Sequence, residues 1–233
     1  MRRIALALVV LLALTGCTDN KKSGGSATPA DDPAALLSAA KQTLDQTTSV
    51  HLVLTGRDIP NGAVALTKGD GVATHAPAFK GKLGVVSGGS PIEADVTAVD
   101  GKVYVKPSFS PSYLQFSPKQ LADLGAPDPA VFLDPAKGVP SLLTALENPV
   151  IKGESRQGSA VVTEVTGTLP GSALTGIFPK APKDKDFQAS FKIDKSSKQL
   201  LAATVSGPFY TSATTAYDLT LDKYGEPVTI SAP

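Results

Sequence analysis

The first ordered part of the chain shows a helical pattern that gives way to a strand pattern. Between residues 33 and 47, apolar side chains recur at every third or fourth position, which is typical of a helix with one buried face. Asp32 and Pro33 stand where the N-cap and the first helical residue are expected. After Ser49 the apolar period changes to two, which predicts a strand up to about Gly56.

The same alternation returns many times further along the chain and predicts a series of strands joined by tight turns. Asp100-Gly101 is typical of a two-residue hairpin, and Gly88-Gly89 marks another sharp reversal. Short helices are expected at residues 118–124, 140–147 and 171–177. The other predicted strands cover residues 63–67, 71–75, 79–86, 91–99, 102–106, 150–153, 160–167, 187–193, 200–206, 216–222 and 227–230.

These elements predict an α+β fold. One long N-terminal helix, about ten strands and a proline-rich middle segment at residues 107–149 fit an antiparallel sheet packed on helices. A twisted sheet with that many strands tends to curl. We therefore expect a curved antiparallel sheet, a half-barrel wrapped over the helices.

The first seventeen residues have the features of an export signal. Arg2 and Arg3 precede an apolar run at residues 4–14, which is too short to span a bilayer as a helix. The run ends in Leu14-Thr15-Gly16-Cys17, which matches the lipobox of bacterial lipoproteins. We expect residues 1–16 to be a signal peptide and Cys17 to carry the diacylglyceryl anchor at the outer face of the cell membrane.

Composition narrows the function classes. Residues 18–32 contain no Val, Ile, Leu or aromatic residue, so residues 17–32 are expected to be the lipidated end and a flexible tether, and residues 33–233 a single domain. Without Arg2 and Arg3 the chain has 20 basic and 21 acidic residues, a net charge of −1, which argues against binding nucleic acid. The sole cysteine excludes an intramolecular disulfide.

Candidate catalytic chemistry is sparse. The two histidines, His51 and His75, have no metal-ligating partner at zinc-site spacing, and no nucleophile elbow or phosphate-binding loop occurs. Glu93 and Asp95 lie two apart and so share one face of a predicted strand, which is typical of a solvated outer face. The sequence predicts no catalytic site, metal site or cofactor, and hence not an enzyme.

The apolar faces of the strands carry the more informative signal. Many inward positions are small or of medium size, so a half-barrel lined by them could remain partly unfilled, although periodicity alone favours a filled core. The Pro- and aromatic-rich segment at residues 109–118 is our candidate for part of a cavity mouth. The predicted lining residues are Leu54, Phe79, Leu83, Val85, Ile92, Val96, Leu142, Leu146, Phe187, Phe191, Val205 and Leu219.

Several segments of the mature chain carry short recognisable motifs, at residues 49–54, 99–104, 133–139, Leu142-Leu143, 163–167 and 224–228. Together these segments resemble the mycobacterial LppX/LprA/LprF/LprG family of envelope lipoproteins, over nearly all of the mature chain. Tyr224 and the segment Phe191-Lys192-Ile193 depart from the family, whose members usually carry Trp there.

The resemblance implies a fold similar to the LolA/LolB-like carriers and an apolar cavity larger than the roughly 300–1,000 Å³ of ordinary ligand pockets. It further implies a protein that binds and carries acylated lipids or glycolipids in the envelope, with a lipid exporter as a possible partner. Two alternatives remain open from the residues. One is a structural or interaction lipoprotein with a filled core, and the other is an envelope hydrolase that uses Glu93 and Asp95.

Overall fold

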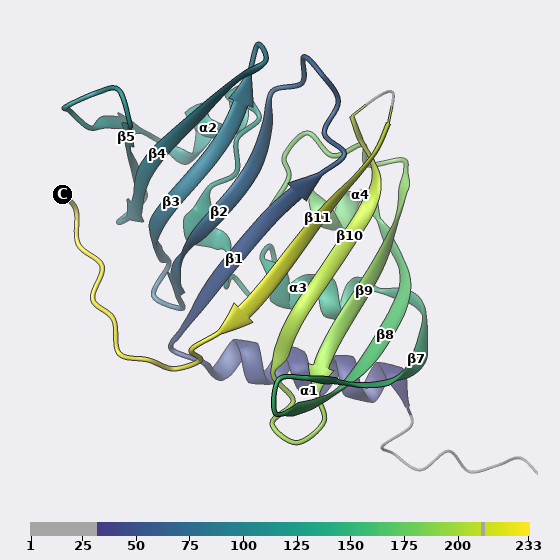
Figure 1. Cartoon of the computed structure of the whole chain (residues 1–233). Coiled ribbons are helices and arrows are strands. Elements are labelled where there is room, and N and C mark those ends of the chain that lie inside the picture. Colours follow the sequence, from purple (N-terminus) through teal and green to yellow (C-terminus); the bar gives the residue numbers. More distant parts are fainter. Residues whose placement is uncertain (1–31, 211–212) are drawn as a thin grey trace, which may run out of the picture.

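A computed structural model shows one antiparallel sheet of eleven strands with its helices on one face (Figure 1). The structure describes residues 32–210 and 213–233. The predicted signal peptide, Cys17 and the tether up to residue 31 lie outside this part of the chain. Within it, none of the helices is long and apolar enough to cross a membrane.

The strands are mostly nine to eleven residues long, long enough to form a tall curved wall. They are β1 (Ser49–Arg57), β2 (Ala65–Thr74), β3 (Ala78–Ser87), β4 (Ser90–Val99), β5 (Lys102–Pro107), β6 (Leu114–Phe116), β7 (Glu147–Gln157), β8 (Ala160–Pro170), β9 (Asp186–Asp194), β10 (Leu200–Tyr210) and β11 (Ala213–Asp222).

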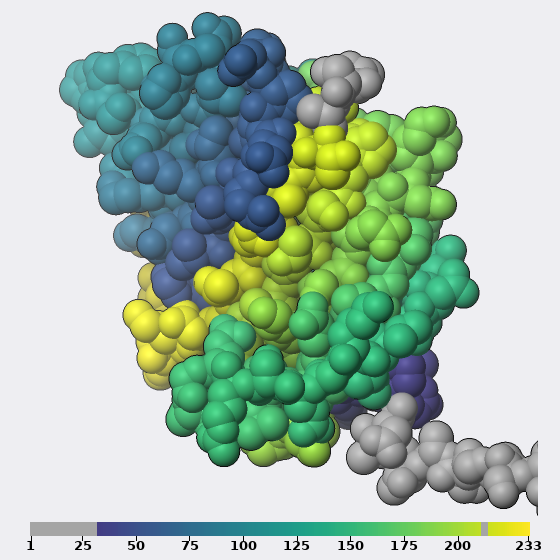
Figure 2. Space-filling model, turned by 45° about the vertical axis from the view of Figure 1, so that its right-hand side comes forward, coloured from purple at the N-terminus to yellow at the C-terminus, as the bar shows by residue number. Residues whose placement is uncertain are grey.

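The sheet consists of two meanders, one from β1 to β6 and one from β7 to β11. They join in the middle of the sheet, where β1 pairs antiparallel with β11 and Leu52 faces Leu221. Figure 2 shows this junction from outside, with the yellow C-terminal strand against the dark blue first strand. The sheet therefore depends on pairing between the beginning and the end of the domain.

The helices are short except for the first. Asp32 caps α1 by accepting a hydrogen bond from the Ala34 amide at 3.0 Å. The inward face of α1 packs against α3 and the sheet, and its Ala40 and Leu44 are fully buried. The helical elements are α1 (Pro33–Gln46), α2 (Pro118–Leu124), the 3₁₀ turn η2 (Pro129–Val131), α3 (Val139–Ala145) and α4 (Gly171–Leu174).

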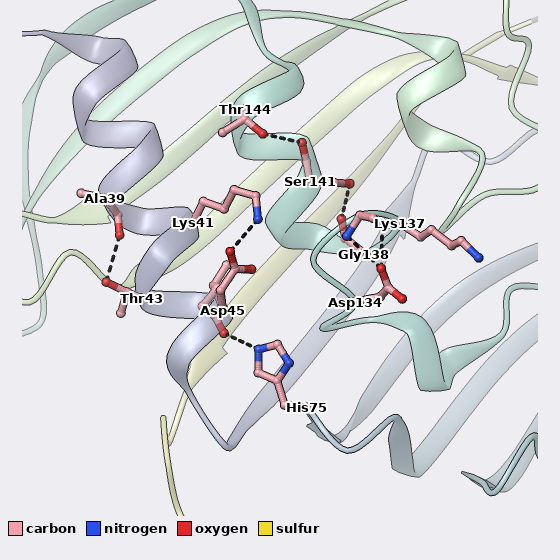
Figure 3. A network of polar contacts seen from close by, with 12 residues as sticks. Ala39, Lys41, Thr43, Asp45, His75, Asp134, Lys137, Gly138, Ser141 and Thr144 are labelled. Carbon is pink, nitrogen blue, oxygen red and sulfur yellow. Dashed lines mark hydrogen bonds and ion pairs between the residues drawn. The ribbon is translucent and has the colours of Figure 1, made fainter.

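Polar contacts fix the C-terminal end of α1 (Figure 3). Lys41 and Asp45 form an ion pair at 2.6 Å one helical turn apart. The His75 ring nitrogen Nε2 lies 3.0 Å from the Leu44 carbonyl oxygen, which also accepts a hydrogen bond from the Thr47 amide at the end of the helix. His75 lies in the turn after β2 and not on a strand, and its role here is to cap a helix end.

The predicted fold class is confirmed, because the sheet is open, curved and antiparallel and its concave face is covered by helices. The first helix and most of the strands begin and end close to their expected positions. The Asp100-Gly101 turn joins β4 to β5 with φ of 54° and 68°, as a tight hairpin requires. Gly88-Gly89 likewise joins β3 to β4.

Several predicted elements were wrong in detail. The strands expected at 63–67 and 71–75 form the single strand β2, because an irregularity between Leu66 and Lys68 interrupts the alternation without ending the pairing. The strand expected at 227–230 does not form. In the sheet, β11 already pairs with β1 on one side and β10 on the other, so no place beside it is free for the C-terminal tail. The tail instead crosses the end of β1, where the Ser49 hydroxyl donates a hydrogen bond to the Glu226 carbonyl at 2.6 Å.

Candidate functional site

An apolar chamber of about 260 Å³ lies between the first meander and the segment that carries α2 and η2. Among the residues that the structure describes, none with a charged side chain lines it. Its walls are formed by Val64, Ala65, Leu66, Leu83, Val85, Ile92, Ala94, Val96, Val103, Val105, Pro107, Phe116, Leu121, Leu124, Gly125, Ala126, Pro127, Pro129, Phe178, Tyr210 and Tyr217.

The sheet wall of the chamber follows directly from strand alternation. Leu83 and Val85 of β3 face Ala94 and Ile92 of β4 in register, so the four side chains form one layer on the concave face. Ala94 is the smallest of the four. Its short side chain leaves space that a Leu or Phe would occupy.

The opposite wall is the short helix α2. Only Leu121 of this helix is buried, whereas Leu124 is 61% exposed at its C-terminal end. The helix ends at Gly125, which adopts a left-handed φ of 79°. The side chain of Lys180 lies directly over Gly125, and its Nζ donates a hydrogen bond to the Leu124 carbonyl at 3.3 Å.

Aromatic rings close the third side of the chamber. The Phe178 ring centroid lies 4.6 Å from that of Tyr217 and 5.0 Å from that of Phe209. The hydroxyls of Tyr210 and Tyr217 are 3.0 Å apart and bond to each other. Burial raises the pKa of Tyr217 well above its usual value, so this polar pair stays uncharged.

Two smaller voids continue from the chamber beneath the sheet. One of about 50 Å³ lies under β1 to β3 and shares Leu83 and Pro129 with the chamber wall. Another of about 30 Å³ lies under β9 to β11 and shares Phe178 and Tyr217 with it.

The chamber opens into an outer pocket of about 490 Å³ with a more polar lining. Both spaces share Val64, Leu124, Gly125, Phe178 and Tyr210, which therefore form the mouth between them. Lys180 is the charged residue that lines the outer pocket, together with the amide of Asn61. Within residues 32–210 and 213–233, no carboxylate lines either space.

The predicted lining residues divide into three groups. Leu83, Val85, Ile92 and Val96 line the main chamber. A second group lines the smaller voids: Leu54, Phe79, Leu142, Phe191, Val205 and Leu219.

Leu146 and Phe187 line none of these spaces. Leu146 packs over Gly167, and Phe187 packs over Gly207 with its ring centroid 4.7 Å from that of Phe209. Each of these glycines leaves room that a large side chain takes up.

The chamber is smaller than the family resemblance implied, and much of its wall was not predicted. The segment at residues 121–129 comes from the end of α2 and the connection after it, Phe178 from the connection after α4, Tyr210 from the end of β10 and Tyr217 from the middle of β11. Of the proposed mouth segment 109–118, Phe116 lines the chamber. The density of prolines and aromatics in residues 107–149 was the sequence signal that pointed to this region.

The carboxylates considered for catalysis lie on the outer face of the sheet. Glu93 bonds to Lys68 and Asp95 bonds to Lys82, and these hydrogen bonds hold the pKa of each carboxyl below its usual value. Neither carboxylate lines the spaces described above. Among the described residues, no group of three or more His, Cys, Asp and Glu is arranged to hold a metal ion.

His51 forms a second polar feature of the outer face. Its Nδ1 lies 2.6 Å from Asp222 and its Nε2 lies 3.0 Å from Asp70, so the ring links β11, β1 and β2. Burial of the ring lowers its pKa, but the hydrogen bonds and charges of the two carboxylates outweigh this and raise it above its usual value.

Comparison with known proteins places this architecture among bacterial lipoproteins. A family model described as LppX_LprAFG lipoprotein matches residues 32–230. The chain is 26% identical to the lipoarabinomannan carrier protein LprG of Mycobacterium tuberculosis over 240 residues, which cover 100% of this chain and 95% of that protein. It is 29% identical to lipoprotein LprA of the same species over 241 residues, covering 97% and 93%.

Solved structures agree on the fold. LprF from Mycobacterium bovis superposes with a TM-score of 0.72 at 19% identity and covers 86% of this chain and 96% of that one. LppX from Mycobacterium tuberculosis gives a TM-score of 0.63 at 20% identity and covers 85% and 98%.

Proposed function

This chain belongs to the LppX_LprAFG lipoprotein family, and from that premise we propose that it is a non-catalytic envelope lipoprotein that binds and carries acylated lipids. The relatives named lipoarabinomannan carrier proteins support a lipid or glycolipid cargo. In this proposal the acyl part of the cargo occupies the apolar chamber and the polar part lies in the outer pocket.

The observation that carries the proposal is the apolar chamber, which has no charged wall and opens at one end. An acyl chain of about fifteen methylenes costs on the order of 12 kcal/mol to expose to water, at ~0.8 kcal/mol per methylene. A protein that shields such a chain removes most of this barrier to transfer between membranes. The shielding needs no reacting group, only a dry surface of the right shape.

Chamber size limits what the protein holds without rearranging. An engineered cavity of ~150 Å³ accepts benzene, so a chamber of about 260 Å³ accommodates part of one acyl chain. More chain requires either the two smaller voids or an outward shift of α2, where Leu121 is the one buried residue. Cargo with several long chains, such as a triacylglycerol or lipoglycan, depends on this expansion.

The membrane anchor completes the proposed arrangement. Lipidation of Cys17 after cleavage of residues 1–16 would hold the domain at the outer face of the cell membrane through the tether at residues 17–32. An exporter that delivers or accepts the cargo remains part of the proposal.

Mass spectrometry of the full chain purified from its own host tests the carrier function. We expect co-purified acyl lipid with the wild-type protein and at least tenfold less with Ala94→Phe, whose ring fills the chamber. Ala202→Phe is the matched control, because Ala202 pairs with Thr220 of β11 and lines neither the chamber nor the smaller voids.

The thermal unfolding midpoint of each variant establishes that the fold is retained. Wild-type protein free of acyl lipid would contradict the proposal and favour a structural envelope lipoprotein with a protein partner.

A further inference from the structure

Large apolar side chains stand exposed around the chamber mouth. Val64 is 65% exposed and Leu124 is 61% exposed, and both line the apolar chamber as well as the outer pocket. Phe109 is 77% exposed and follows two residues after Pro107, which also lines the chamber. The apolar surface is thus continuous from the interior of the chamber to the outside of the molecule.

These residues lie on segments at one end of the molecule. The β1–β2 loop and the β5–β6 connection, which carry Val64 and Phe109, stand at the upper end in both views of the protein, and α1 crosses the lower end (Figures 1 and 2). Exposed aliphatic residues of similar size also occur elsewhere. Val150 on the edge strand β7 is 53% exposed, yet it lines neither the chamber nor the outer pocket.

Cationic groups accompany the apolar residues at this end. Lys180 lines the outer pocket and bonds to the carbonyl of Leu124. Lys106 lies over the ring of Tyr113 with its Nζ 5.7 Å from the ring centroid. Apolar side chains beside lysines and a tyrosine are the combination that enters the boundary between lipid headgroups and acyl chains.

We propose that Val64, Phe109 and Leu124 form a docking rim that enters the outer layer of a lipid bilayer. The rim places the mouth against the bilayer, so an acyl chain passes from the membrane to the chamber without crossing water. This inference rests on the proposed carrier function. It adds the membrane surface as a direct partner of the domain, separate from the anchor at Cys17.

The tether is long enough for the rim to reach the anchoring membrane. A strand of eleven residues spans roughly 36 Å at ~3.3 Å per residue, which approximates the height of the sheet. The fifteen residues from 18 to 32 extend to at most about 50 Å. The domain can therefore turn its mouth toward the same membrane that holds its N-terminus.

The absence of Trp from the sequence allows a direct test. Leu124→Trp and Val150→Trp each introduce a single tryptophan at an exposed apolar site, the second as a matched control. With the full chain bound to vesicles that contain brominated phospholipid, we expect the fluorescence of Leu124→Trp to be quenched by the lipid and protected from aqueous iodide. We expect the opposite for Val150→Trp.

A second measurement separates bilayer contact from contact with lipid inside the chamber. We expect Phe109→Ser, at the rim residue that lines neither the chamber nor the outer pocket, to transfer lipid between vesicles roughly tenfold more slowly than wild type, and Val150→Ser to match wild type. Equal iodide quenching of the two tryptophans, or an unchanged transfer rate in Phe109→Ser, would overturn the docking rim. If acyl lipid still co-purifies with the wild-type chain in that case, the carrier function stands without the docking rim. If no acyl lipid co-purifies with the wild-type chain, the carrier function itself fails.

Discussion

At the scale of single residues, the outer face of the sheet carries a titrating link between the two meanders. His51 lies between Asp70 and Asp222, and its ring joins three neighbouring strands. Because the pKa of this histidine is raised in the folded chain, the folded state binds the proton more tightly than the unfolded state. The stabilisation is complete below the unfolded pKa of about 6.5 and is lost as pH rises through the folded pKa.

We expect His51→Gln to lower the free energy of unfolding more at about pH 5.5 than at about pH 8. Urea unfolding of wild type and variant across this range measures the difference. The same comparison in an Asp222→Asn background serves as the control, and the pH-dependent part should shrink because one of the two carboxylates is gone. If the difference in the free energy of unfolding between wild type and His51→Gln instead grows as pH rises, the raised pKa assigned to His51 is contradicted.

Close approach of the backbone to a large ring explains two glycines in neighbouring strands. Gly71 of β2 pairs with Gly81 of β3, and the Phe79 ring lies over them. A Cβ at Gly71 would lie 2.5 Å from the Phe79 ring, and 2.7 Å from the Lys80 carbonyl, which cannot move freely.

Gly71→Ala should therefore lower the free energy of unfolding by about 1–3 kcal/mol through overpacking. The control is Gly69→Ala on the same strand, where a Cβ would meet the flexible end of Leu83 at 3.1 Å. That variant should remain within about 1 kcal/mol of wild type. Chemical denaturation gives both values, and equal losses would show that packing under Phe79 is not the cause.

At the scale of elements, α2 is the least supported wall of the chamber, since Leu121 is its one buried residue. A capping box holds its first turn. The Gln120 amide donates to the Ser117 hydroxyl at 3.3 Å, and the Ser117 amide donates to the Gln120 side chain at 2.8 Å. The stability of this helix governs how readily the chamber widens.

Ser117→Ala should cost about 1 kcal/mol of local helix stability and speed amide hydrogen exchange within α2 about fivefold. Global unfolding should change little, because the helix buries little apolar surface. Ser112→Ala, on an exposed residue outside the helix, is the control. Unchanged exchange in residues 121–124 would show that the cap does not hold the wall.

The sequence correctly predicted those structural features that depend on residues close together in the chain. Alternation fixed which side chains of β3 and β4 face inward, and Asp100-Gly101 fixed a hairpin, because each depends on neighbouring residues. The strand expected at 227–230 failed for a non-local reason. Its alternation is real, but β1 and β10 already occupy both sides of β11.

At the scale of the whole molecule, the site could be predicted only in part. The part of the chamber wall that the sheet provides was predicted, including Leu83 and Val96. The opposite wall, from residues 121–129, is brought next to the sheet only by tertiary packing, which the sequence pattern does not show. Phe187 was expected to line the cavity but fills the space above Gly207 instead. Which inward side chains meet an open space depends on glycines of neighbouring strands, and periodicity does not report that.

In the proposed function, the concave face takes up an acyl chain in the chamber beside Ala94. Calorimetric titration of the delipidated chain with a single-chain phospholipid, below its micelle concentration, tests this claim most directly. We predict saturable binding of about one molecule with a negative heat-capacity change, as burial of apolar surface requires, and at least tenfold weaker binding by Ala94→Phe than by Ala202→Phe. No saturable heat with the wild-type chain, or equal affinity of the two variants, would contradict it.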